Sequence, residues 1–224
     1  MATKKEATVV NLPALKLQQF TLKIVGDSPL ISHAWSHKAK LMLMNSGQKK
    51  ALAGKEFDPP SIEFAESLYW LTDKPDLTGL SDTQAAKILA EVIPQSKFGF
   101  PTTAFKTAAL DAGFQQGILA AKAGTANALA KTTARGAFRI LGEFAVINGT
   151  PTPREDIVKI GMNGSRVAYR AEFKTWQTEL SIMFNTLSIS AEQIINLINV
   201  GGFANGVGDW RPAKDGSFGT FHVE

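Results

Sequence analysis

Three stretches in the second half of the chain alternate apolar and polar side chains, and this alternation constrains the fold more than any other feature. They are GAFRILGEFAVING at 136–149, VAYRAEF at 167–173 and TELSIMFN at 178–185. A period of two buries one face of a strand and leaves the other in solvent. KTWQ at 174–177 fits a short connection between two antiparallel strands. We therefore expect an antiparallel sheet in this half of the chain.

The segment that follows changes to helical spacing. Ser190 and Gln193 have the spacing of a capping box, in which each side chain binds the backbone N–H of the other residue. The apolar residues that follow form one stripe of a helix. Gly201 or Gly202 is expected to end this helix in a left-handed conformation. SFGTFHV at 217–223 is expected to be the last strand.

The first half of the chain supplies a strand and helices. QQFTLKIVG at 18–26 alternates as a strand does, and FPTTAFKTAALDAGFQQGILAAKA at 100–123 has the composition and entry of a helix. With the second half, the order is β-α-β-β-α-β. This is the ferredoxin-like arrangement, whose four-stranded sheet is also the scaffold of the RNA-recognition motif (RRM). We therefore expect an α+β fold with a ferredoxin-like, RRM-like palm.

The domain organisation expected from this order is simple. A length of 224 residues suits one core with a large insertion. We expect a flexible N-terminal tail at 1–17 and a single domain at 18–224. Within that domain, residues 36–95 would form a helical insertion after the first strand. Residues 148–168, which include TPREDIVKIGMNGSRV, would form a projecting hairpin.

Composition excludes several classes of protein. The chain has no cysteine, which excludes disulfide scaffolds and thiolate metal sites and suits a reducing cytoplasm. No apolar run approaches the roughly 20 residues that cross a bilayer. The glycines at 206–208 lie between a helix and a strand, whereas a dinucleotide-binding loop leads from a strand into a helix. We therefore expect a cytoplasmic protein with no membrane span and no small-molecule cofactor.

The basic residues gather in two segments. The net charge is +4, and residues 38–56 and 96–139 carry +4 and +5, so the rest of the chain carries −5. A basic zone on an acidic body is typical of a protein that binds a polyanion, although solvated helix faces would give the same pattern. The phosphate contacts expected from these segments are Lys38, Lys40, Lys49, Lys50, Lys131, Arg135 and Arg139.

The last segment, GGFANGVGDWRPAKDGSFGTFHVE at 201–224, is rich in glycines and aromatic residues. Because glycine has no Cβ, Gly206 and Gly208 would let the backbone approach a phosphodiester closely. Trp210 and Phe218 would offer faces on which bases stack. A tight turn with buried aromatic rings is the alternative. The charged residues expected beside the bound strand are Arg211 and Lys214.

FANGVGDWRPAKDGSFGTF at 203–221 resembles the glycine-rich loop of the RAMP superfamily, which follows the second helix of a ferredoxin-like domain. The insertion and the projecting hairpin also resemble the plan of that family. RAMP proteins form the backbone subunits of CRISPR effector complexes, and relatives process guide RNA. From PLISHAWSHKAK at 29–40 to its end, the chain also resembles a family of tailed-phage proteins. The resemblance implies that the chain binds single-stranded nucleic acid as a homo-oligomer assembled side by side.

The histidines are His33, His37 and His222. RAMP ribonucleases use a histidine as general acid or base, and His33 lies just past the first strand, where such a residue can fall. His33 and His37 have the spacing of metal ligands on a helix, but no third ligand lies at a fitting distance along the chain. We expect a non-enzymatic protein without a catalytic residue or metal site. The alternatives are a RAMP-type endoribonuclease that uses His33, and a phage protein that inhibits or sequesters a host defence component.

Overall fold

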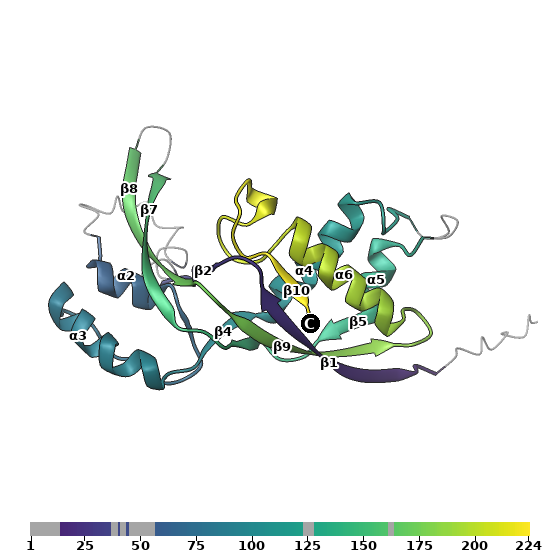
Figure 1. Cartoon of the computed structure of the whole chain (residues 1–224), viewed down its shortest axis with the longest axis horizontal. Coiled ribbons are helices and arrows are strands. Elements are labelled where there is room, and N and C mark those ends of the chain that lie inside the picture. Colours follow the sequence, from purple (N-terminus) through teal and green to yellow (C-terminus); the bar gives the residue numbers. More distant parts are fainter. Residues whose placement is uncertain (1–13, 37–39, 41–43, 45–56, 123–127, 161–163) are drawn as a thin grey trace, which may run out of the picture.

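A four-stranded sheet joins strands from distant parts of the chain (Figure 1). Its order is β10-β1-β9-β5, and all neighbouring strands are antiparallel. The structure, a computed structural model, describes residues 14–36, 40, 44, 57–122, 128–160 and 164–224. The strands of this sheet are β1 (Leu17–Gly26), β5 (Phe138–Ile140), β9 (Gln177–Asn185) and β10 (Phe221–Val223).

The two central strands show why the alternating sequence forms this sheet. Leu22 of β1 lies opposite Leu180 of β9, and both are buried. The next pair is Lys23 and Glu179, which lie on the open face in solvent. Burial of one face removes apolar side chains from water and leaves the charged ones hydrated. The α+β class predicted from the alternation is confirmed.

Helices α4 (Thr102–Gln115) and α6 (Ala191–Ala204) pack against each other over the buried face of the sheet (Figure 1). Gly201 is the position where α6 approaches α4 most tightly. A Cβ at Gly201 would lie 2.6 Å from the backbone nitrogen of Ala109. A shorter helix, α5 (Lys131–Ala137), packs beside α4 and leads directly into β5.

The start of α6 agrees with the sequence prediction, but its end does not. Gln193 N–H donates to Ser190 Oγ at 3.1 Å, and Ser190 N–H donates to Gln193 Oε1 at 3.0 Å, so the capping box is present. Gly201 and Gly202 lie inside the helix, so the prediction that one of them is its left-handed cap is wrong. The residue with positive φ is Gly206, whose N–H donates to the carbonyl oxygen of Gly201 at 2.9 Å.

Two three-stranded sheets complete the fold. One has the order β2-β8-β7, and the other has the order β3-β4-β6. Strands β7 and β8 pair along their whole length, and Figure 1 shows this hairpin rising away from the main sheet. The strands of the two sheets are β2 (Leu30–Ser32), β3 (Tyr69–Trp70), β4 (Phe98–Pro101), β6 (Phe144–Ile147), β7 (Pro151–Ile160) and β8 (Gly164–Phe173).

Two details of the strand prediction are wrong. The segment at 174–177 does not join two paired strands, because β8 pairs with β2 and β7 whereas β9 pairs with β1 and β5. The last strand begins at Phe221 rather than at residue 217. The N–H of Gly219 donates to the carbonyl oxygen of Pro29 at 2.8 Å instead of joining a ladder.

The described part of the predicted insertion contains two helices, α2 (Pro60–Glu66) and α3 (Asp82–Val92), followed by a 3-10 turn η1 (Ile93–Gln95). They lie beside the β7–β8 hairpin in Figure 1. Residues 1–13 of the predicted tail, and most of residues 37–56, lie outside the described residues. No helix in the described ranges is long and apolar enough to cross a membrane.

Candidate nucleic-acid interface

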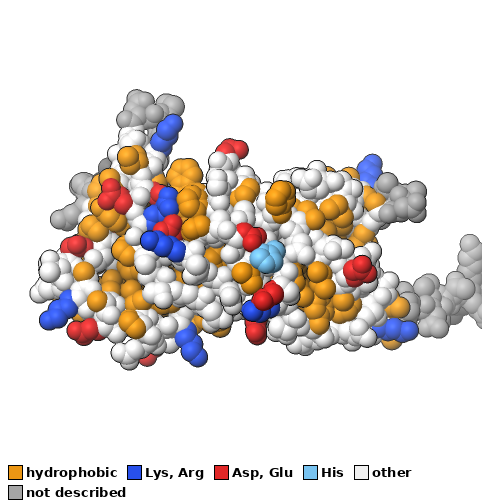
Figure 2. All heavy atoms as spheres, viewed as in Figure 1, with side chains coloured by type: hydrophobic (Ala, Val, Ile, Leu, Met, Phe, Trp, Pro, Cys, Tyr) orange, Lys and Arg blue, Asp and Glu red, His pale blue; other side chains and the backbone are white. Residues whose placement is uncertain are grey.

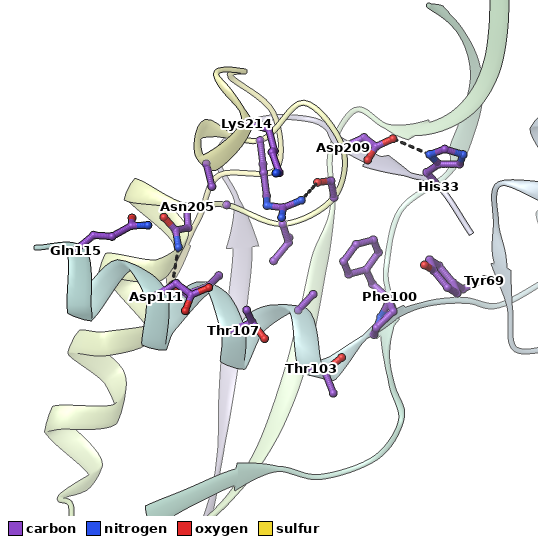
Figure 3. A pocket seen from close by; sticks show the side chains of 18 residues that line it. His33, Tyr69, Phe100, Thr103, Thr107, Asp111, Gln115, Asn205, Asp209 and Lys214 are labelled. Carbon is purple, nitrogen blue, oxygen red and sulfur yellow. Dashed lines mark hydrogen bonds and ion pairs between the residues drawn. The ribbon is translucent and has the colours of Figure 1, made fainter. Parts of the chain in front are cut away.

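A groove of about 490 Å³ lies between α4 and the loop that follows α6 (Figure 3). One wall is the face of α4 that carries Thr103 and Thr107, and the other is the loop at 205–214. His33 and Tyr69 lie at one end of the groove, which we name the His33 end. Asp111, Gln115 and Asn205 lie at the other end, which we name the Asp111 end.

The loop follows this path because glycine occupies its tightest positions. Gly206 has φ +63° and Gly208 has φ +82°. A Cβ at Gly208 would lie 2.5 Å from the carbonyl oxygen of Ile31, and Asp209 N–H donates to that same oxygen at 3.0 Å. The close approach of Gly208 is therefore to strand β2 of the protein itself.

Some amides of the loop are already used within the protein. Gly206 N–H binds the end of α6, and Val207 N–H donates to the carbonyl oxygen of Gly219 at 2.9 Å. By contrast, the N–H groups of Gly208, Trp210 and Arg211 donate to no acceptor among the residues that the structure describes. These three amides are the ones left for a ligand.

The two loop aromatics differ in their surroundings. The side chain of Trp210 is on the surface, with the residue 42% exposed, and its backbone has φ +53°. The ring centroid of Phe218 lies 4.5 Å from the guanidinium carbon of Arg154, which β7 supplies. One face of Phe218 is thus taken by a cation, whereas Trp210 is open to solvent. The alternative of a turn with buried aromatics does not describe Trp210.

The charges in the groove are balanced. Arg211 Nη1 donates to the carbonyl oxygen of Gly208 at 2.8 Å, and Lys214 is exposed on the 3-10 turn η2 (Pro212–Lys214). The carboxylates of Asp111 and Asp209 line the same groove. On the face shown in Figure 2, basic and acidic side chains are interspersed over the described residues. Basic residues therefore form no continuous band on that face.

The His33 end contains an ion-pair network that the sequence analysis did not find. His33 Nδ1 lies 2.8 Å from Asp209 Oδ2, and Arg170 Nε lies 3.4 Å from the same oxygen. Arg170 Nη1 lies 3.6 Å from Asp156 Oδ2, and Asp156 Oδ1 accepts a hydrogen bond from Arg154 Nε at 3.0 Å. The network links the groove to the β7–β8 hairpin. No local signal could have revealed it, because His33 and Asp209 are 176 residues apart.

This network controls the ionisation of Asp209. Burial acts to raise the pKa of the carboxyl group, but the hydrogen bond from His33 and the charges of His33, Arg170 and Arg211 outweigh burial and lower the pKa. The nearby phenol of Tyr69 responds in the opposite way. Its pKa is raised by burial and by the negative charge of Asp209. At neutral pH the His33 end therefore holds a carboxylate beside a neutral phenol.

The wall formed by α4 is polar and repeats every four residues. Thr103, Thr107, Asp111 and Gln115 share one face of the helix and line the groove. The hydroxyls and the amide can both donate and accept hydrogen bonds, so this wall favours neutral polar groups of a ligand. This spacing was readable in the sequence, where the segment at 100–123 was predicted to be a helix but no polar face was assigned to it.

Lys131 of the predicted phosphate contacts lies near the Asp111 end. Its Nζ donates to Asp111 Oδ1 at 2.6 Å and lies 5.1 Å from the ring centroid of Phe114. Four residues further along α5, Arg135 is exposed, and Arg139 follows on β5. Of these three basic residues, Lys131 contacts a groove residue, and Arg135 and Arg139 follow it along the chain on α5 and β5.

Arg135 and Arg139 lie near the half-buried amine of Lys106. Lys106 Nζ donates to the carbonyl oxygens of Arg135 and Phe138, both at 2.7 Å. Burial lowers the pKa of Lys106, and the charges of Arg139 and Arg135 lower it further. The described residues supply no ion pair to either arginine. Three cations therefore lie close together, with no carboxylate of the described residues paired to either arginine.

Of the remaining predicted contacts, Lys40 is the one that the structure describes, and it does not line the groove. Lys40 is exposed and lines a neighbouring hollow beside Trp35 and Lys74. Lys38, Lys49 and Lys50, together with His37, lie outside the described residues. Within the described ranges, no cluster of three His, Asp or Glu residues could hold a metal ion.

Comparison with known proteins gives fold likenesses at low identity. No protein-family model matches the sequence, and no curated protein matches it. The structure is similar to Cmr6 from Pyrococcus furiosus, with 12% identity over 94% of this chain and 100% of that chain, and a TM-score of 0.35. It is also similar to a chain of a CRISPR RNA-guided surveillance complex, with 8% identity over 92% of this chain and 67% of that chain, and a TM-score of 0.33.

Proposed function

We propose that this protein binds single-stranded nucleic acid in the groove between α4 and the loop at 205–214, and that it does so without catalysing a reaction. The observation that carries the proposal is the loop itself. Asp209, Arg211 and Lys214 of the loop line the groove, and the exposed side chain of Trp210, which does not itself line it, lies between Asp209 and Arg211 in the sequence. An aromatic face next to a cation is how proteins bind single strands without reading their sequence.

The bound strand would continue from the groove along α5. Lys131 and Arg135 are four residues apart and so share one face of that helix, and Arg139 follows on β5. The cluster around Lys106 lacks an anion, so phosphates at Arg135 and Arg139 would stabilise it. Copies of the protein would lie side by side along the strand as a homo-oligomer.

We infer that the main sheet with α4 and α6 is a ferredoxin-like, RRM-like palm within a RAMP-like architecture. The order of the four antiparallel strands and the packing of the two helices on one face support this. Apart from Arg139 on the edge strand β5, the open face is not part of the proposed site. At its centre β1 and β9 carry Thr21, Lys23, Glu179 and Ser181, without the aromatic rings on which an RRM stacks bases. The resemblance to tailed-phage proteins suggests action in a host cytoplasm.

The test is the binding of a labelled single-stranded oligonucleotide, measured by fluorescence anisotropy at several salt concentrations. The logarithm of the affinity should fall linearly with that of the salt concentration, by about 0.7 per neutralised phosphate. Lys214→Ala should weaken binding and flatten the slope. Lys87→Ala, on an exposed position of α3, removes the same charge away from the groove and should change neither. A native slope near zero would refute the proposal.

A RAMP-type endoribonuclease is the second candidate, and one observation favours it. His33 lies in the groove with its Nδ1 bonded to Asp209, an arrangement that orients an imidazole for acid–base chemistry. His222 pairs with Asp27 in the same way at 2.6 Å but does not line the groove, so it supplies the control. Cleavage of labelled RNA that His33→Ala abolishes and His222→Ala retains would favour the enzyme. Intact RNA with native protein would favour the binding protein.

A further inference from the structure

We propose that the Asp111 end of the groove selects nucleobases that carry an exocyclic amino group, namely adenine, cytosine and guanine, over uracil and thymine. This inference rests on the proposed function, because it assigns specificity to the same groove. It differs from sequence-tolerant stacking, which every base can satisfy. The selecting residues are Asp111, Gln115 and Lys131.

The charges of the groove decide which part of a nucleotide each wall can hold. Phosphates are repelled by the carboxylate of Asp111, and the threonine hydroxyls of α4 carry no charge that would offset this repulsion. The cations Lys214 and Arg211 lie on the opposite, loop wall. A strand would therefore lie with its phosphates toward the loop and its bases toward α4. A volume of about 490 Å³ is within the usual range for a site that holds a small molecule, and so has room for one nucleoside.

The second carboxylate oxygen of Asp111 is available to accept a hydrogen bond at the point where a base would lie. Lys131 Nζ donates to Oδ1 at 2.6 Å, while Oδ2 accepts no hydrogen bond from the described residues. The contact with Lys131 keeps the ammonium beside the carboxylate. The amide of Gln115, one turn further along α4, lies at the same end (Figure 3). This end therefore offers a strong acceptor next to donors.

That pattern matches one group of bases and opposes the other. Adenine and cytosine present an amino donor next to a ring-nitrogen acceptor, and guanine presents its amino donor next to the ring nitrogen N3, which also accepts. The amino group would donate to Asp111 Oδ2, and the neighbouring acceptor would receive from Lys131 or Gln115. Uracil and thymine present a carbonyl on each side of their single N–H donor. One carbonyl would then face the carboxylate, which is repulsive.

The experiment compares homopolymers of adenine, cytosine, uracil and thymine, of equal length and at one salt concentration, by anisotropy competition. The polymers with amino groups should bind about tenfold more tightly. An adenine polymer in which purine replaces adenine lacks only the amino group and should bind like the uracil polymer. Equal affinities for all polymers would overturn the inference and leave the proposed function intact. Failure of every polymer to bind would overturn both.

A variant assigns the preference to its residue. Asp111→Asn keeps the shape, but its amide can present either a donor or an acceptor, so the preference should fall to about twofold or less. Asp73→Asn removes the same charge at an exposed position outside the groove and should keep the native preference. An unchanged preference in Asp111→Asn would overturn the role of Asp111. The purine polymer tests the inference on native protein even if the variant does not fold.

Discussion

Replacing Gly208 by Ala tests whether the loop is held against β2 as described. The substitution adds one methyl group at a backbone with φ +82°. That Cβ would lie 2.5 Å from the carbonyl oxygen of Ile31 and 2.9 Å from Leu30 Cδ1. The loop cannot easily shift away, because Asp209 N–H is bonded to the same oxygen of Ile31.

The expected loss of stability has two parts. An L-residue in left-handed conformation costs about 1–2 kcal/mol relative to glycine. Overlap with a well-packed backbone adds about 1–3 kcal/mol. Gly79 allows the backbone cost to be measured without the overlap cost. It has φ +73°, but no atom lies within 4 Å of the position that a Cβ would occupy. Gly79→Ala should therefore show only the first part.

Urea unfolding of native protein and both variants measures the difference. We expect the midpoint for Gly208→Ala to fall well below that for Gly79→Ala, with the slope of the unfolding free energy against urea unchanged. For a chain of this size each kcal/mol corresponds to about 2–4 °C in melting temperature, so heat denaturation gives a second reading. If the two variants lose equal stability, Gly208 does not pack against β2 and the account of the loop fails.

Three further predictions concern other parts of the site and core. Trp210→Ala should weaken single-strand binding by about 5- to 150-fold, the value of one stacked base, with little change in melting temperature; a large drop in melting temperature with normal binding would contradict this. Because the pKa of Asp209 is lowered in the folded state, its carboxylate stabilises the protein above the unfolded pKa and loses that effect as the pH falls toward the folded value. Urea unfolding at a series of pH values should therefore show the stability gap between native protein and Asp209→Asn narrowing below about pH 4. Gly201→Ala should push α6 away from Ala109 and lower the melting temperature by several degrees, whereas equal stability would mean that the helices have room.

The sequence predicts elements well where one local rule decides. The alternation at 18–26 and 178–185 gave β1 and β9, because burial of one sheet face requires that period. The capping box at Ser190 was readable because both partners lie within one turn. The pairing of the strands could not be read from the sequence. A period of two identifies the buried face of a strand but does not say which other strand lies beside it. The strand at 167–173 was predicted to pair with the next strand in the sequence, whereas β8 pairs with β7 and β2.

The wrong prediction that Gly201 or Gly202 ends α6 has a different cause, because glycine suits two kinds of position. A glycine near the end of a helix is equally suited to a left-handed cap and to a close crossing, and only the position of α4 decides the matter for Gly201. The structure brings Arg211 and Lys214 of the loop into one groove with His33. The ion pairs that His33 makes with Asp209, and Asp209 with Arg170 of β8, join residues that lie far apart in the sequence. Long-range ion pairs leave no periodic signal in a single sequence.

The position of β1 at the centre of the main sheet has a consequence for biosynthesis. Its partners are β9 and β10, which the ribosome makes only after about 150 more residues. At the usual rates of translation, β1 waits on the order of ten seconds or more before it can pair. During that time Leu22 and Ile24 have no partner strand to cover them, and the nearby charges are Lys23, which lies between them, and Lys16, which precedes them. The palm can close only after most of the chain has been synthesised, so the apolar face of β1 stays uncovered until then.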